Sequence, residues 1–370
     1  MNERQIIQTI KHHIAQRGYT CADELIENFY LSLKARPFVL IGGRGDVDMA
    51  LLPMLFAEAV GATEANGRFR KLTVRPDWMD SSDLFGWLNL EGKFIPGVII
   101  DFMKAAQLDP EKPYFLCLDR VILSRAEYYL RDMLAAVESR GQEALPYVTM
   151  AYYGRDEAAK ESYGVIPVLD NLYIIGTINL EETSLPLNQK LLDRVHTIRM
   201  TPEDLTGEPA GLPEAPELDN GFLATRYFSL EQCAQQSDVL KEYFSRLEEM
   251  NRMLSGATAY LGFRIRNDTI LYLMHNRLTG VLPEDSAMDQ EICMKVLTRI
   301  QGGSKMIKAT LCKLFCYCSG AFGEFSPEQT VGQAMTLAAG DPACRYPRAA
   351  KHVARMVCLC ETDGYASFWS

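Results

Sequence analysis

The sequence predicts an α/β protein, in which a parallel five-stranded sheet flanked by helices is followed by an all-α lid domain. Strand-like and helix-like segments alternate between residues 37 and 200, a pattern typical of a parallel sheet. Residues 201–221 are acidic and rich in Pro and Gly, and every later segment has helical spacing. We therefore expect a short helical lead-in over 1–36, an α/β core over 37–200, a linker over 201–221, and a helical lid and C-terminal domain over 222–370.

Five strand-like segments support the prediction of the sheet, and one of them, PYFLCLDR, is a continuous apolar run that ends in charge. Strands buried on both faces of a parallel sheet read as continuous apolar runs rather than alternating ones. The predicted strands, in chain order, are PFVLIGG (37–43), FRKLTVRP (69–76), PYFLCLDR (113–120), NLYIIGTIN (171–179) and VHTIRM (195–200).

The composition favours a protein with a substantial core. The 370 residues are 48% hydrophobic and 23% charged. The net charge of −10 argues against broad binding to nucleic acid or to a membrane surface. No apolar run approaches the roughly 20 residues of a membrane span. The ten cysteines follow no secretory leader and lack the paired spacing of zinc sites, so we expect a cytoplasmic location and no metal.

Residues 37–61 read as a buried strand, a glycine-bearing turn and a helix, which is the layout of a phosphate-binding loop. That loop requires Gly, four residues, Gly, Lys and then Ser or Thr. Aligned on Gly42, the last three positions hold Val47, Asp48 and Met49. At an effective dielectric of about 20, a carboxylate about 4 Å from a phosphate is repelled by about 4 kcal/mol. The candidate nucleotide-binding positions of this degenerate loop are Gly42, Gly43, Arg44, Gly45, Asp48 and Met49.

The helix after this loop contains Pro53. An interior proline costs about 3 kcal/mol, but the first turn of a helix tolerates one. We therefore expect the helix to begin late, near Leu52, with a remodelled loop before it. The same residues also fit an ordinary strand–turn–helix that never bound phosphate.

Polar residues at three further strand ends extend the candidate site. They are Asp119, Asn179 and Arg194. Ligands of open α/β sheets bind beyond the carboxyl ends of the strands, so these residues predict one site together with the loop. Each also has a structural interpretation: Asp119 can cap the next turn, Asn179 can form a turn, and Arg194 can pair with Asp193.

This order of features resembles the AAA+ ATPases, and most of all their McrB-like branch. The resemblance covers nearly the whole chain. The segments that carry it are VRPDWMDSSDLFGWLN (74–89), IIGTINLEETSLPLNQKLLDRV (174–195), LGFRIRNDTILYL (261–273), MDQEICMKVLTRIQG (288–302) and YPRAAKHVARMVCLCETDGYASFW (346–369).

The resemblance assigns roles position by position. Asp119 falls on the Walker B aspartate that orients magnesium, and Arg120 replaces the glutamate that polarises the attacking water. Asn179 falls on sensor 1 and Arg194 on the arginine finger that acts on a neighbouring subunit. Arg264 or Arg266 falls on sensor 2 of the lid. The residues that act on a neighbour's nucleotide are thus retained, whereas those that hold and hydrolyse this chain's own nucleotide are lost.

Two of the replaced positions have exchanged the sign of their charge, which suggests that their side chains interact directly. Asp48 stands where a lysine is expected and Arg120 where a glutamate is expected. We expect these two side chains to approach each other across a vacant pocket, as an ion pair or through a water molecule.

The resemblance implies a pseudo-ATPase that acts by assembly. We expect a structural or regulatory subunit in a homo- or hetero-oligomeric AAA+ ring, with a nuclease partner, indirect contact with DNA and a role in prokaryotic restriction or antiviral defence. No cofactor is expected. The alternatives are an active motor that binds ATP or GTP with magnesium through an unorthodox loop, and a plain scaffold or adaptor.

Overall fold

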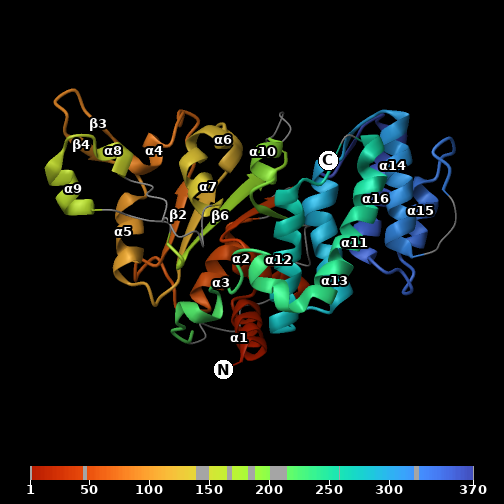
Figure 1. Ribbon diagram of the computed structural model, residues 1–370, viewed down its shortest axis with the longest axis horizontal. Coiled ribbons are helices and arrows are strands. Elements are labelled where there is room, and N and C mark those ends of the chain that lie inside the picture. Colours follow the sequence, from red (N-terminus) through yellow and green to blue (C-terminus); the bar gives the residue numbers. More distant parts are fainter. Residues whose placement is uncertain are drawn as a thin grey trace. The chain divides into compact units, whose positions relative to one another are not determined.

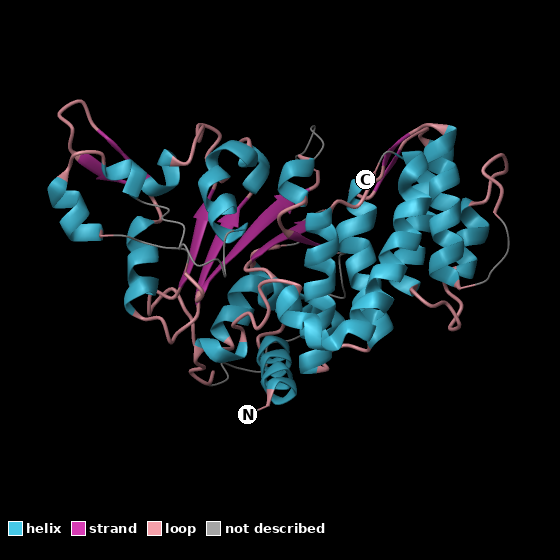
Figure 2. Cartoon of the chain, in the orientation of Figure 1, coloured by secondary structure: helices cyan, strands magenta, loops and turns pink. Residues whose placement is uncertain are grey.

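The computed structural model describes residues 2–44, 48–138, 150–164, 169–181, 188–200, 215–257, 259–320 and 325–369. The chain divides into two compact units, Met1–Phe228 and Ser229–Ser370. Figures 1 and 2 show that the first unit contains the large sheet and that the second is almost entirely helical. The predicted helical domain starts at residue 222, whereas residues 222–228 belong to the first unit.

The first unit is built on a five-stranded sheet in which all strand pairs are parallel, in the order β2-β5-β6-β1-β7. Each strand lies within the run predicted for it, which confirms the expected α/β class with a parallel sheet. The strands are β1 (Phe38–Gly43), β2 (Phe69–Thr73), β5 (Tyr114–Asp119), β6 (Leu172–Asn179) and β7 (His196–Arg199).

Helices cover both faces of this sheet. Successive side chains of a strand point to opposite faces. On β6, Leu172 and Ile174 line a small cavity together with side chains of α5 (Ile100–Leu108) and α7 (Arg131–Glu138). Tyr173, on the other face, stacks on Phe115 of β5 at 5.4 Å between ring centroids. Phe115 in turn meets Phe56 of α3 (Leu51–Glu58) edge-on at 6.1 Å.

Shorter elements complete the first unit. A small antiparallel hairpin, β3 (Gly86–Leu88) with β4 (Phe94–Pro96), stands apart from the main sheet. The remaining helices are α1 (Glu3–Gln16), α2 (Asp23–Ala35), α4 (Ser82–Phe85), α6 (Ala126–Tyr129), α8 (Met150–Tyr153), α9 (Glu157–Tyr163) and α10 (Gln189–Leu192).

The helical lead-in is tied to the segment that ends the first unit. Tyr30 Oη and Lys34 Nζ of α2 donate to the same carbonyl, Phe222 O, at 2.9 and 2.7 Å. The fully buried Lys34 ammonium also lies 3.1 Å from Glu3 Oε1 of α1. These bonds join parts of the chain that are far apart in sequence, so the lead-in packs as part of the first unit.

The second unit consists mainly of helices, and two of them begin at backbone N–H groups that are bonded to a carboxylate from another helix. Asp289 accepts the backbone N–H groups of Arg348 and Ala349 at the start of α16, at 2.8 and 2.7 Å. Glu361 accepts those of Val331 and Gly332 at the start of α15, at 2.8 and 3.1 Å. The helices are α11 (Ser237–Leu254), α12 (Phe263–Thr279), α13 (Glu284–Glu291), α14 (Lys305–Ser319), α15 (Gly332–Ala338) and α16 (Pro347–Thr362).

Two details of this unit depart from a purely α-helical domain. A π-helical turn, Ile292–Val296, follows α13 and carries Lys295, whose Nζ lies 3.5 Å from Asp268 Oδ2 with both side chains buried. The chain end forms a short antiparallel pair, β8 (Gln301–Gly302) with β9 (Ala366–Ser367). No described helix has the length and apolar character that crossing a bilayer requires.

A buried histidine makes the stability of the first unit depend on pH. His13 of α1 lies with Nε2 3.5 Å from Glu58 Oε1 of α3, and burial lowers the pKa of its imidazole below the usual 6.5. The unfolded chain therefore takes up this proton first as the pH falls, so stability is lost below about pH 6.5. Between pH 7.5 and 5.5 we expect urea unfolding, followed by circular dichroism, to show a loss of up to about 1.4 kcal/mol per pH unit.

The neighbouring His12, which is exposed, provides the matched control. His13→Gln should remove most of the pH dependence between 6.5 and 5.5, whereas His12→Gln should retain the wild-type slope. Equal slopes for wild type and His13→Gln would contradict the assignment.

Candidate functional site

The candidate site lies at the carboxyl edge of the main sheet. β1 is flanked by β6 and β7, and the chain leaves β1 for the distant β2 but later crosses over β1 to reach β7. This reversal of direction makes the edge beside β1 a topological switch point, where ligands of α/β proteins bind. The register places Gly43 beside Asn179 and Thr73 beside Asp119. The parallel sheet thus brings three of the predicted strand ends to one edge.

At the end of β1, the backbone carbonyls accept hydrogen bonds and a methionine side chain packs against the last glycine. Gly42 O and Gly43 O accept the N–H groups of Met200 and Leu180, at 2.8 and 2.9 Å. The buried Met49 thioether packs on Gly43, since a Cβ placed on that glycine would lie 3.2 Å from Met49 Sδ. The position that holds a hydroxyl in a phosphate-binding loop therefore places an apolar side chain against the strand end.

The neighbouring loop residues face outward. Arg44 and Asp48 are exposed, and Asp48 Oδ1 accepts the N–H of Ala50 at 3.0 Å. Gly45 lies outside the described residues. Helix α3 begins at Leu51, with Pro53 as its third residue, which confirms the predicted late start. The helix therefore begins two residues beyond Met49, the last position of the phosphate-loop pattern.

Both carboxylate oxygens of Asp119, at the end of β5, are engaged by the protein. Thr177 of β6 donates from Oγ1 to Asp119 Oδ1 at 2.6 Å, and Lys71 Nζ of β2 lies 3.7 Å from Oδ2. Thr177 Oγ1 also accepts the backbone N–H of Arg120 at 2.9 Å. One buried hydroxyl thus fixes both the carboxylate and the backbone of the following residue.

Arg120 has an unusual backbone conformation. Its φ of 59° and ψ of 53° are left-handed, and no other described residue except glycine has a positive φ. This conformation costs an ordinary residue about 1–2 kcal/mol. The turn that carries Arg120 is therefore maintained by its surroundings, including the bond to Thr177.

The expected direct ion pair between Asp48 and Arg120 is absent. Within the described ranges, no carboxylate oxygen of Asp48 lies within ion-pair distance of the Arg120 guanidinium, and Asp48 instead caps the turn before α3. Lys71 is a cation that pairs across this edge, and its partner is Asp119 rather than Asp48. The charges are therefore arranged differently from the linked exchange that the sequence suggests.

Asn179 and Arg194 have local structural partners. Asn179 ends β6, and its Oδ1 accepts the N–H of Glu181 at 3.0 Å in an Asx turn. Arg194 lies between α10 and the start of β7, so the prediction that it follows a strand end is wrong. Its Nε donates to Glu138 Oε1 of α7 at 2.7 Å. Its Nη1 also donates to Lys190 O at 3.3 Å. The predicted partner Asp193 is thus replaced by a carboxylate from another helix.

Arg264 and Arg266 belong to the second unit, in the first turn of α12. Arg266 donates from Nε and Nη2 to Asn267 Oδ1, at 3.0 and 2.8 Å, and stacks against two phenylalanine rings. The ten cysteines are free thiols, and the described residues contain no cluster of His, Cys, Asp or Glu side chains suited to a metal ion.

Sequence reasoning missed the residues that complete these contacts, namely Lys71, Thr177 and Glu138. Lys71 was missed because the charged residues of its strand are typical of a strand that faces solvent. Glu138 was missed because it is remote in sequence from Arg194. Only Thr177 had a signal, since it lies in the strand that also supplies Asn179.

Comparison with known proteins adds little to this description. The model of a domain of unknown function (DUF8727) matches residues 214–365, less than half of the chain. No curated protein matches the sequence. Among solved structures, NtrX from Brucella abortus is similar at 13% identity and a TM-score of 0.27, with 80% of this chain and 54% of that chain covered. The chain thus spans about half the length of that structure's chain, and the low TM-score carries no argument.

The left-handed backbone of Arg120 leads to a stability prediction. Glycine adopts this conformation without the steric cost that a side chain adds. Arg120→Gly should therefore raise the free energy of unfolding of the first unit by about 1 kcal/mol in urea titrations.

Arg125, whose φ is −77°, provides the matched control. Arg125→Gly should lower the free energy of unfolding by about 0.5–1 kcal/mol, because glycine gains only flexibility there. If both variants lost stability equally, the backbone of Arg120 would not be strained.

Proposed function

We propose that this chain is a catalytically impaired AAA+-like subunit of the McrB-like type, which acts through assembly rather than through its own nucleotide turnover. The observation that carries the proposal is the packing of the Met49 thioether on Gly43, where a phosphate-binding loop needs a hydroxyl and open backbone N–H groups. The exposed Asp48 adds a negative charge to the same loop. An anionic phosphate is disfavoured beside that carboxylate.

The magnesium side of the site supports the same proposal. A carboxylate that orients magnesium needs oxygens free to face the ion and its waters. Here Thr177 and Lys71 engage the two oxygens of Asp119. The residue after Asp119 is Arg120, and a guanidinium cannot act as a general base. The edge therefore lacks a group in the position that would activate water.

The proposed biological setting rests on the family resemblance. It places the chain in a ring with an active AAA+ partner and a nuclease, in a prokaryotic system that restricts foreign DNA. Within such a ring, the retained Arg194 would act on the partner's nucleotide. A finger arginine contributes 10³–10⁵ in rate in other nucleotide hydrolases, so a subunit without its own catalysis can still govern turnover.

Nucleotide titration tests the loss of binding. We expect isothermal titration with magnesium-ATP and magnesium-GTP to detect no binding with a Kd below about 1 mM, a limit of about −4 kcal/mol. The double variant Asp48→Lys/Met49→Thr restores the cation and the hydroxyl, and should gain measurable affinity for one of the two nucleotides.

Asp77→Lys/Met79→Thr makes the same exchanges at exposed positions of the same unit and should bind no nucleotide. Micromolar binding by the wild type, accompanied by phosphate release, would reject the proposal in favour of an active motor.

The role of Arg194 is tested with an active AAA+ protein, the class of partner that this proposal implies. Wild type should raise the ATP turnover of that partner by at least about tenfold, and Arg194→Ala should abolish the increase. Glu138→Gln removes the carboxylate that holds Arg194 and should retain the stimulation, since it leaves the guanidinium in place.

Arg131→Ala provides the control, because Arg131 is exposed and pairs with its own neighbour Asp132. If Arg194→Ala stimulated the partner as well as wild type does, the chain would be a scaffold without a finger residue.

A further inference from the structure

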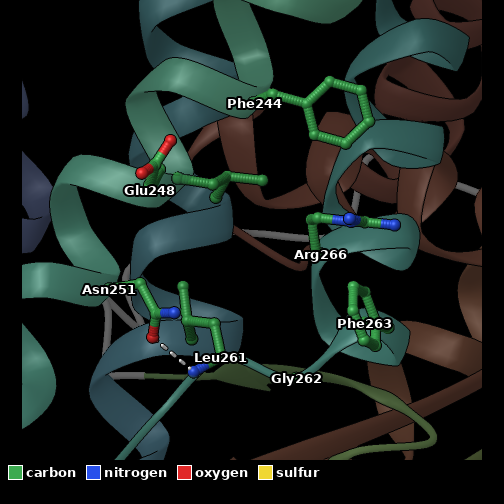
Figure 3. Close-up of a pocket in the computed structure, with 8 residues that line it drawn as sticks. Phe244, Glu248, Asn251, Leu261, Gly262, Phe263 and Arg266 are labelled. Atoms are coloured by element: carbon green, nitrogen blue, oxygen red, sulfur yellow. Dashed lines mark hydrogen bonds between the residues drawn. The ribbon is translucent and has the colours of Figure 1, made fainter.

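The second unit contains a pocket that the proposed role at the sheet edge does not use. Its volume is about 370 Å³, within the range of sites that bind small organic molecules. One side is a face of α11, which contributes residues at helical spacing, and the other is the segment that enters α12. The lining residues are Phe244, Leu247, Glu248, Asn251, Leu261, Gly262, Phe263 and Arg266. Figure 3 shows their arrangement.

The walls of the pocket are mainly apolar. Leu247 and Leu261 are buried, whereas the ring of Phe263 is 78% exposed. An aromatic ring left in water beside a hollow gains free energy when a ligand covers it, at about 25 cal/mol per Å² of apolar surface. Apolar walls with a few convergent polar groups are typical of sites for small ligands.

Two charged side chains line this pocket, Glu248 and Arg266, and Arg266 is its cation. Its guanidinium carbon lies 5.0 Å from the ring centroid of Phe244 and 4.8 Å from that of Phe263. In Figure 3 the two rings lie above and below the guanidinium. Asn267 Oδ1 accepts from Nε and Nη2 of Arg266. The rings and the amide oxygen fix the plane of the guanidinium, and neither carries a negative charge.

Over the described ranges, Arg266 pairs with no carboxylate, and its polar bonds go to Asn267 Oδ1. Glu248 also lines the pocket, but Figure 3 places it on the opposite side from Arg266. Its Oε1 lies 3.6 Å from Nη2 of Arg252, one turn further along α11. The pocket thus contains a positioned cation whose Nη1 group has no acceptor among the described residues.

We propose that this pocket binds a small organic acid, in which an apolar body covers Phe263 and Leu247 and a carboxylate pairs with Arg266. A guanidinium recognises a carboxylate through two parallel N–H···O bonds, and this pairing strengthens where water is excluded. The two stacked rings pre-orient the guanidinium, so little freedom is lost when the acid binds. The class of ligand follows from this combination of apolar walls and one uncompensated cation.

A pair of probes with the same shape and different charge tests the proposal on the full chain. 3-Phenylpropionate carries a carboxylate, and 3-phenylpropanamide replaces it with a neutral amide. Titration calorimetry should show the acid binding at least tenfold more tightly than the amide. Arg266→Gln should reduce the affinity for the acid to that for the amide, and Phe263→Ala should weaken both ligands several-fold.

Arg264→Gln is the matched control, because it removes the same charge from the same turn of α12 at a residue outside the pocket lining. It should retain the tenfold preference for the acid. Equal affinity of the two probes for wild type, or no binding of either, would overturn the proposal without any variant. Displacement of the acid by magnesium-ATP would also overturn it, because the site would then belong to a nucleotide.

Discussion

The parallel register of β1 with β6 and β7 is the constraint on which the candidate site depends. It places the carboxyl ends of the strands at one edge, so that residues separated by long helical crossovers meet there. Gly43 lies beside Asn179, and Thr177 reaches Asp119 on the next strand. Because the core strands are buried on both faces, a shift of register would displace apolar side chains and polar strand ends together. The same burial therefore fixes both the core and the site.

This burial also explains why the sheet could be predicted. A strand such as β1, in which all six residues are buried, leaves a continuous apolar run in the sequence. The boundary between the units was predicted only approximately: the acidic, Pro- and Gly-rich segment 201–221 marks its region, but residues 222–228 belong to the first unit. It depends on Phe222 O, which accepts bonds from Tyr30 and Lys34 almost two hundred residues earlier. The start of α16 likewise depends on a distant side chain, Asp289, rather than on a local capping residue.

The sequence predicted which strand ends share an edge of the sheet, but it did not predict which side chains would contact one another there. Gly43, Asp119 and Asn179 were identified because each ends a strand, and the parallel sheet brings these strand ends to one edge, whereas Arg194 precedes β7. Their partners depend on lateral neighbours, which a linear pattern does not reveal. Asp119 binds Thr177 and Lys71 from the two strands beside it, and Asp48 caps its own turn instead of meeting Arg120. The edge is therefore compensated internally, which favours an arrangement maintained for stability over one kept open for phosphate.

Arg194 and Arg266, which have distinct proposed roles, differ in their side-chain partners. Arg194 is bound to Glu138 at 2.7 Å, so any phosphate that it contacts must displace a carboxylate already in place. Both side chains are partly buried, with exposed fractions of 28% and 22%, so displacing this carboxylate costs more than breaking a fully exposed ion pair, which contributes about 0–1 kcal/mol. Arg266 stacks against two aromatic rings and donates to an amide oxygen, and it has no carboxylate partner among the described residues. Under the two proposals, Arg194 exchanges the Glu138 carboxylate for a phosphate of the partner's nucleotide, whereas Arg266 acquires its counter-ion from a ligand bound in the pocket.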